Sequence, residues 1–317
     1  MSLGVLTSRL MLGLNEFVAV VKPQAYQDEV QDFVKDRKLR KVFNRRRSVE
    51  HSEHGTKIQF MSDLHLERIK YDFDIAANAP FLLLAGDIGR FCDYEAYNAF
   101  LVQQCEQFDL VLLLAGNHDF YGSSREEGLA VAKAFADDAA MKGKLKFLNR
   151  RRIDLPGTSV TVLGCTLHSN IAPDYTVLTN DFKRIKGWTV SDHNAEHERE
   201  LAWLKASLEE LAEDEQPRKV VIATHYAPSV EKTTHPANEH SAVSQCFSSD
   251  TLKDFCNWTG SELVTDWIFG HTHWNTKFRA GHVLVQSNHF CNDSSRLSWW
   301  QKKTLYRPFD PAAVIEL

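Results

Sequence analysis

The sequence predicts a layered α/β fold, and two features of the chain indicate it. From residue 56 onward, short apolar segments alternate with amphipathic ones, which is typical of strands connected by helices. Several apolar segments are also followed directly by a short polar motif, as happens where the strands of an open α/β sheet end at a ligand site.

Seven segments are expected to be strands and three to be helices. Phe81–Ala85 and Leu110–Ala115 contain no polar residue, so we expect them to be buried on both faces of a sheet. The other expected strands are Ile58–Met61, Val160–Leu167, Val220–Thr224, Trp267–Phe269 and Val283–Gln286. The expected helices, in which apolar residues recur with helical spacing, are Tyr94–Phe108, Arg125–Asp138 and Asp192–Glu213.

The first 55 residues differ from the rest, and we assign them to a helical, basic N-terminal extension that precedes a domain of residues 56–317. A segment with helical spacing of apolar residues around Val30 runs into eight basic residues between Lys35 and Arg47. Such a cluster can dock on an acidic partner, a membrane or a nucleic acid. We favour the alternative of a solvated helix end whose apolar side packs on the domain.

Composition and charge narrow the class of protein. The chain has 43% hydrophobic and 25% charged residues, as is ordinary for a globular protein. Its formal net charge of −5 disfavours a nucleic-acid partner, because polyanion binding requires a basic face. Six scattered cysteines without a C-x-x-C pair predict a reduced, cytoplasmic chain. No apolar run approaches the roughly 18 residues of a membrane span, and no secretory signal is expected.

Five polar motifs follow expected strands. They are Asp63-Leu64-His65, Gly86-Asp87, Gly116-Asn117-His118-Asp119, Thr224-His225 and Gly270-His271-Thr272-His273. Because ligand sites lie at the carboxyl ends of the strands in open α/β sheets, we expect these motifs to converge. The glycines permit sharp turns and close approach of the backbone. In the two motifs with alternating ligand types, both side chains would share one face if the extended conformation persisted.

Seven of these side chains are expected to bind metal: Asp63, His65, Asp87, Asn117, His225, His271 and His273. Their nitrogen and oxygen donors, without a thiolate, suit Mn, Fe, Zn, Co or Ni. Seven protein ligands are too many for one such ion, so the set predicts two divalent metal ions that share one carboxylate. Each motif alone is common in turns and in structural roles, but five in this order indicate one site.

The ordered motifs resemble the calcineurin-like metallophosphoesterase superfamily, over about residues 58–288. The resemblance implies an α/β/β/α sandwich with a dinuclear site at the carboxyl ends of the strands. It implies a first metal ion on Asp63, His65 and His273, a second on Asn117, His225 and His271, and Asp87 as the bridge. The stretches 163–167 and 180–182 are similar to those of fungal members whose substrates are poorly defined.

The resemblance also implies a chemistry, the hydrolysis of a phosphate ester. Two cations generate the hydroxide that attacks phosphorus, so no protein nucleophile is needed. His118 is expected to be the general acid that protonates the leaving alkoxide. Asp119 is expected to orient His118 and to favour its charged form.

Two departures from the superfamily's protein serine/threonine phosphatases disfavour a protein substrate. Those enzymes extend the second motif to Gly-Asp-x-x-Asp-Arg-Gly, which Gly86-Asp87 lacks, and they carry glutamate where this chain has Asp119. We therefore expect a small phosphomonoester or phosphodiester. The alternatives are a nuclease, a protein phosphatase and a non-catalytic scaffold. The negative net charge disfavours a nuclease, and the complete ligand set disfavours a scaffold.

Two further groups of residues are weaker candidates. Four residues are expected to line the substrate pocket: His168, Asn170, Asn180 and Asp181. The equal alternative is that they are polar loop residues without a functional role. The polar segment Pro228–Asp250 lies between two metal motifs. It is expected to be either a lid over the site or a solvated connection.

Overall fold

The computed structural model describes residues 55–317 except residues 240 and 293, and the statements below concern these residues. The expected helix and basic cluster of the N-terminal extension lie outside the described residues. Within the described part, no helix is both long and apolar enough to cross a membrane. All six cysteines fall in this part, and none forms a disulfide.

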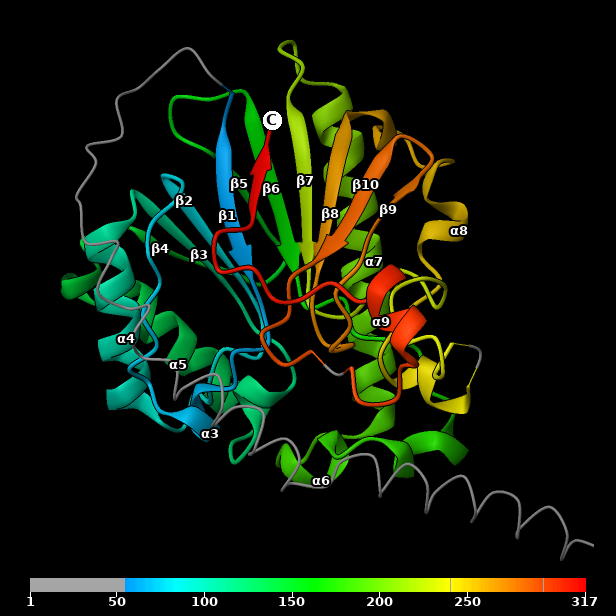
Figure 1. Cartoon of the computed structure of the whole chain (residues 1–317). Helices are drawn as coiled ribbons and strands as arrows, with labels where there is room; N and C mark the ends of the chain where they lie inside the picture. Colours follow the sequence, from blue (N-terminus) through cyan, green and yellow to red (C-terminus); the bar gives the residue numbers. More distant parts are fainter. Residues whose placement is uncertain (1–54, 240, 293) are drawn as a thin grey trace, which may run out of the picture. The chain divides into compact units, whose positions relative to one another are not determined.

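Two mixed sheets form the centre of the domain (Figure 1), with strand orders β11-β1-β2-β3-β4 and β5-β6-β7-β8-β10-β9. The first sheet consists of β1 (Lys57–Met61), β2 (Phe81–Ala85), β3 (Leu110–Leu114), β4 (Leu145–Leu148) and β11 (Val314–Glu316). The second consists of β5 (Arg151–Asp154), β6 (Val160–Cys165), β7 (Lys219–Thr224), β8 (Val264–Phe269), β9 (Lys277–Ala280) and β10 (Val283–Ser287). The inner strands are parallel, and the antiparallel strands β11, β5 and β9 lie at sheet edges.

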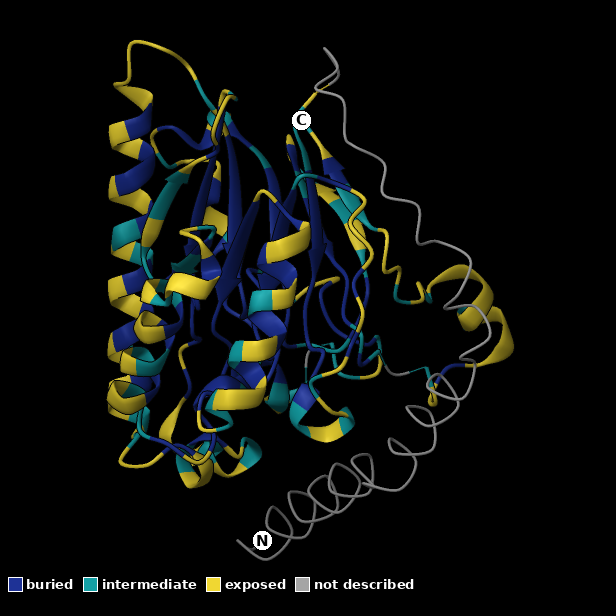
Figure 2. Cartoon of the chain, turned by 90° about the vertical axis from the view of Figure 1, so that its left-hand side faces the viewer, coloured by how far each residue is buried: buried dark blue, intermediate teal, exposed yellow. Residues whose placement is uncertain are grey.

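Helices cover the outer face of each sheet. The helices are α3 (Leu66–Ile69), α4 (Tyr94–Gln107), α5 (Arg125–Asp137), α6 (Asp181–Arg184), α7 (Val190–Ala212), α8 (Leu252–Phe255) and α9 (Trp299–Thr304). One apolar cluster joins α4 and α5 to the outer face of the first sheet. Another joins α7 and α8 to the outer face of the second. Figure 2 shows the inner strands almost entirely buried and the outer sides of the helices exposed. The edge strands β5 and β9 have no buried residue.

The inner faces of the two sheets pack directly on each other. Leu83 and Leu112 of the first sheet meet Val162 and Val221 of the second in one buried cluster. Neighbouring residues such as Leu82 point to the opposite face and contact the helices, because side chains alternate along a strand. The expected two-sided burial and the α/β/β/α layering are therefore confirmed.

The seven expected strands and three expected helices are all present, and all except β2 have at least one shifted end. Helix α7 begins at Val190, because Thr189 forms a capping box with Asp192. Four strands were not expected: β4, β5, β9 and β11. They are three or four residues long, and each contains at least one charged residue. None of them therefore has the continuous apolar run that is typical of an inner strand.

Candidate metal centre

The predicted ligands meet where the carboxyl ends of both sheets come together. Asp63 and His65 follow β1, Asp87 follows β2 and Asn117 follows β3. His225 follows β7, and His271 and His273 follow β8. The two sheets therefore each contribute side chains to the site.

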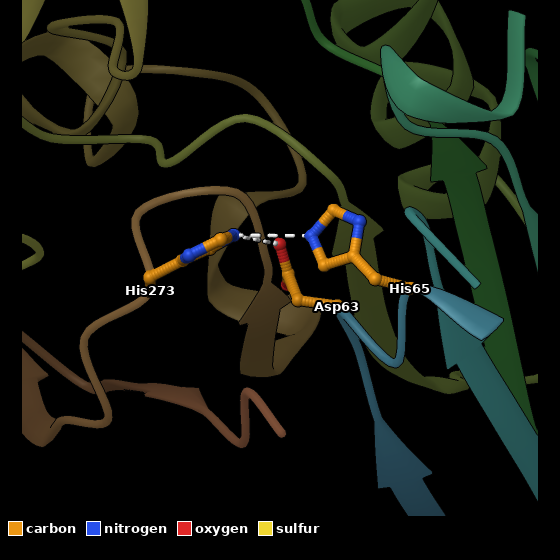
Figure 3. A group of neighbouring side chains, drawn as sticks. All are labelled: Asp63, His65 and His273. Atoms are coloured by element: carbon orange, nitrogen blue, oxygen red, sulfur yellow. Dashed lines mark hydrogen bonds and ion pairs between the residues drawn. The ribbon is translucent and has the colours of Figure 1, made fainter. Parts of the chain in front are cut away.

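Asp63, His65 and His273 form the first group, with one donor atom from each lying within 4.8 Å of the others (Figure 3). His273 Nε2 lies 3.2 Å from Asp63 Oδ1 and 3.2 Å from His65 Nε2. His65 Nδ1 lies 3.2 Å from Glu67 Oε1. Because Nδ1 donates its proton to Glu67, the Nε2 lone pair of His65 points into the group, as metal binding requires.

Asp87, His225 and His271 form the second group, and all three are buried. His225 Nδ1 donates to Ala85 O at 3.0 Å, and His271 Nε2 donates to Cys246 O at 3.2 Å. These bonds leave Nδ1 of His271, and Nε2 of His225 once it has lost its proton, as lone-pair donors. Asn117 Oδ1 lies 3.3 Å from His225 Nε2, so an amide oxygen completes a nitrogen and oxygen set that fits a divalent transition metal.

Asp87 lies between the two groups. Its Oδ2 atom is 3.4 Å from His225 Nε2 and 3.9 Å from His65 Nε2. Its Oδ1 atom accepts a hydrogen bond from His118 N at 2.8 Å. One carboxylate therefore faces both donor groups while its other oxygen fixes the neighbouring loop, which is the geometry of a bridging ligand.

The pKa values of the predicted ligands indicate which of them can bind a cation directly. Burial disfavours the charged form of Asp87, but His225 outweighs this and holds the carboxyl pKa well below its usual range. Burial would lower the pKa of His225, but Asp87 raises it to about 9. Burial, with a smaller contribution from His118, lowers the pKa of His65 to about 4. His65 is therefore neutral at pH 7, whereas His225 must release a proton to bind a metal ion.

The backbone at five of the seven ligands is left-handed. The φ angles are 54° at Asp63, 47° at His65, 53° at Asp87, 72° at His271 and 50° at His273. The condition for a shared face in the two alternating motifs, that the extended conformation persists, is therefore not met. Left-handed residues curl each loop, so backbone N–H groups turn inward, and His271 N donates to both carboxylate oxygens of Asp63 at 3.2 and 3.1 Å. Such conformations cost energy in non-glycine residues and cluster at functional sites.

Two glycines make this close packing possible. Gly86 has a φ of +90°, and a Cβ atom there would lie 2.3 Å from His225 Nδ1. At Gly116 a Cβ atom would lie 2.2 Å from Asp87 Oδ1 and 2.5 Å from His225 Nε2. The backbone approach expected from the motifs is therefore present at both positions.

His118 lies at the edge of the first group. Its ring stacks on Tyr121 with a centroid separation of 4.2 Å and meets the edge of His65 at 4.5 Å. The side chain is 19% exposed, and Nδ1 lies 3.6 Å from Glu67 Oε1. Glu67 therefore lies on the Nδ1 side of the ring.

The structure corrects the role expected of Asp119. Its Oδ2 atom accepts from Gly116 N at 2.7 Å and from Asp87 N at 2.8 Å, and Oδ1 accepts from Tyr97 OH at 3.0 Å. The carboxyl group is used to join the second and third motifs, and Glu67 lies beside His118 instead. Glu67 is two residues after His65, but nothing in the sequence indicated which histidine it would contact.

Asp181 contacts the predicted ligand Asn117 at its amide nitrogen. Its Oδ1 atom accepts from Asn117 Nδ2 and from Tyr121 OH, both at 2.7 Å, and Oδ2 accepts from Tyr226 OH at 3.0 Å. Asp181 is buried, so it is not placed to line an open substrate pocket as expected. The contact with the amide nitrogen turns Asn117 Oδ1 toward the second group.

The other three expected pocket residues lie in different environments. His168 is buried, and its Nδ1 atom pairs with Glu200 Oε2 at 2.8 Å. Asn170 and Asn180 are exposed on loops. A fully buried residue that the motifs did not reveal is His289, whose Nε2 atom lies 3.7 Å from Asp63 Oδ2. No sequence signal marked it, because it follows β10 outside the five motifs.

The segment Pro228–Asp250 is not a solvated connection, because many of its described residues are buried. Cys246 O accepts the hydrogen bond from His271, and the Phe247 ring stacks on His271 at 4.6 Å. The segment therefore covers the second group, which agrees with the expectation of a lid rather than with that of a solvated connection.

Two sheets with donor groups at the shared strand ends define a metal-binding α/β sandwich. The chain belongs to the calcineurin-like phosphoesterase family, whose model matches residues 56–275. An uncharacterised protein of Acanthamoeba polyphaga mimivirus, L509, is 22% identical over 270 residues, which cover 73% of this chain and 89% of that protein. The phosphopantetheinyl hydrolase of Mycobacterium tuberculosis has a similar fold, with a TM-score of 0.56 and 12% identity, over 76% of this chain and 91% of the hydrolase.

Proposed function

We propose that this protein is a hydrolase that cleaves a small phosphate ester with two divalent metal ions, which are Mn, Fe, Zn, Co or Ni. The observation that carries the proposal is the pair of donor groups that face one oxygen of Asp87. When bound, two such ions would supply Lewis acidity toward the phosphate and an ionised water at neutral pH.

The side chains around the two groups divide the remaining work. His118 delivers a proton from Nε2 to the leaving oxygen, which contributes about 10²- to 10⁴-fold in rate for a well-placed acid. Glu67 and Tyr121 hold the ring through the contacts at Nδ1 and at the ring face. Asp119 does not contact the substrate but fixes the loops that carry Asp87 and Asn117.

A small mono- or diester is the proposed substrate. His273, in the first group, is 34% exposed, whereas the segment Pro228–Asp250 covers the second group. A substrate therefore approaches from the side of the first group and of His118. The missing Asp-Arg-Gly extension after Asp87 disfavours a phosphoprotein, and the net charge of −5 disfavours a nucleic acid. The six unpaired cysteines keep the cytoplasm as the proposed compartment.

Metal analysis of two variants tests the mechanism. Protein purified without chelator should contain two transition metals per chain, and Asp87→Asn should lower the occupancy of both sites. His118→Asn should keep the metal content and lose kcat strongly on esters with poor leaving groups, but much less on nitrophenyl esters, whose leaving group hardly needs a proton. A fully active protein with one metal ion, or an equal loss on both ester types, would contradict the proposal.

The substrate class needs its own test. At fixed metal content, nitrophenyl phosphate, bis-nitrophenyl phosphate, cyclic nucleotides, phospholipid headgroups and phosphopeptides should be compared by kcat/KM. We expect a small ester to be the best substrate. Phosphopeptides that exceed every small ester would refute the substrate class and leave the metal site standing.

A further inference from the structure

An exposed aromatic and basic surface lies near the C-terminal end of the chain. In the described part, the exposed large hydrophobic side chains are Val177, Trp299, Trp300 and Leu305. Three of them fall within seven residues, and the two tryptophans are 65% and 67% exposed. Because a soluble surface rarely gathers such side chains, the group indicates a contact with another molecule.

The charged side chains between Asp293 and Asp310 all have one sign. Residues 294–309 contain four basic residues and no acidic residue, in a chain whose net charge is −5. The four are Arg296, Lys302, Lys303 and Arg307, and all are exposed. The Lys303 ammonium lies 5.6 Å from the centre of the Trp299 ring. The α9 surface, defined here as Trp299, Trp300, Leu305 and the four basic residues, is therefore apolar and cationic together.

The α9 surface is connected to the wall of the metal centre. Trp274 directly follows the ligand His273, and its ring lies 6.4 Å from Tyr306. Arg296 Nη2 donates to Asn238 Oδ1 at 2.9 Å, which ties the surface to the segment that covers the second group. A molecule docked on the α9 surface would thus lie next to the metal centre.

We propose that the α9 surface docks the protein on a membrane surface of anionic phospholipid headgroups. Tryptophan prefers the boundary between headgroups and acyl chains, because its ring is apolar and its N–H is polar. Lysine and arginine beside it gain from the negative surface potential. The charge argues against the other occupants: a second copy in a two-fold dimer would bring the same cationic surface against itself, and the N-terminal extension carries its own basic cluster.

Vesicle sedimentation with the full chain tests this proposal. We expect binding to phosphatidylcholine vesicles that contain phosphatidylserine, little binding to phosphatidylcholine alone, and weakening by added salt. The variant Trp299→Ala with Trp300→Ala should bind about tenfold or more weakly, because it exposes less apolar surface to insertion. Lys302→Gln with Lys303→Gln should lose about fivefold per lysine. The matched control, Val177→Ala with Lys133→Gln, removes one exposed apolar side chain and one exposed lysine elsewhere and should bind like wild type.

Each contrary outcome overturns the docking assignment. Binding that the tryptophan variant does not weaken would place the contact elsewhere, for example in the N-terminal extension. Equal binding to neutral vesicles would remove the role of charge. Self-association that the tryptophan variant abolishes, without vesicle binding, would make the surface an interface between copies. Vesicle sedimentation is measured without hydrolysis, so a failure of docking would leave the proposed function standing, and a failure of the proposed function would leave docking standing.

Discussion

Replacing Asp181 by alanine should selectively weaken binding at the second metal group. The Asp181 carboxylate fixes the Asn117 amide by accepting from Nδ2 at 2.7 Å. Without that acceptor, the longer hydrogen bond from Nδ2 to Tyr121 OH at 3.1 Å is left to hold the amide. The amide can then rotate more readily and present its NH₂ group, which cannot bind a metal ion. Loss of a residue that orients a ligand typically lowers metal affinity about 10- to 100-fold, which is about 1.4 to 2.8 kcal/mol.

Chelator competition on the intact protein measures this effect. Asp181→Ala should release the second ion at 10- to 100-fold lower chelator concentration, while the first ion is held as in wild type. Asp181→Asn keeps the shape and one acceptor oxygen, so we expect a smaller loss. Asn180→Ala is the matched control, because its side chain is exposed on the adjacent loop position.

The kinetic pattern decides between two roles for Asp181. An unchanged affinity for the second ion with a raised KM would refute the positioning role. That result would restore the substrate-binding role that the sequence predicted. Tyr226→Phe, which removes one donor to Asp181 Oδ2, should have an effect in the same direction but weaker than Asp181→Ala.

Three further predictions concern the loops, the pH dependence and the N-terminal extension. Gly116→Ala should lower metal content because its Cβ atom would lie 2.2 Å from Asp87 Oδ1. Gly157→Ala, at a φ of +71° with nothing within 4 Å of the new Cβ atom, adds backbone strain away from the site and should keep the metal content; equal metal loss in both would contradict this. In metal-free protein the pKa of His225 is raised from 6.5 to about 9, so its contribution to stability is complete below pH 6.5 and is lost as the pH rises through 9. Metal affinity should rise over the same interval, measured by titration at several pH values, and a flat profile would contradict it. Removing residues 1–50 should leave kcat/KM on a small ester unchanged, and a folded but inactive product would show that the extension belongs to the active unit.

The fold could be predicted as far as the apolar pattern reached. Strands such as Leu110–Leu114 are continuous apolar runs, because helices cover one face and the other sheet covers the other. Strand Arg151–Asp154 lies at a sheet edge and gains its conformation from pairing with β6, so its own residues give no apolar signal. Edge strands of this kind depend on a neighbour that the local sequence does not contain.

The ligand types and their meeting place were also predictable, because each motif directly follows an apolar run. The partners of those ligands were not. Glu67 lies between His65 and His118, and Asp181 reaches Asn117 across 64 positions of sequence. Such contacts follow from how separate loops fold beside each other, and they were missed or misassigned for that reason. The left-handed backbone at Asp63 and His271 was equally invisible, because neither residue type demands it.

The division of the ligands between the two sheets has a consequence for how the domain holds together. The first group takes Asp63 and His65 from the first sheet and His273 from the second, whereas the second group takes Asp87 from the first sheet and two histidines from the second. A bound ion therefore acts as a clamp across the sandwich, and its binding free energy opposes the sliding or parting of the halves. Substitutions of residues buried between the two sheets, far from any ligand, would then lower the affinity for metal before they unfold the chain. The amount of metal that the protein retains would therefore report on how well the two sheets are packed against each other.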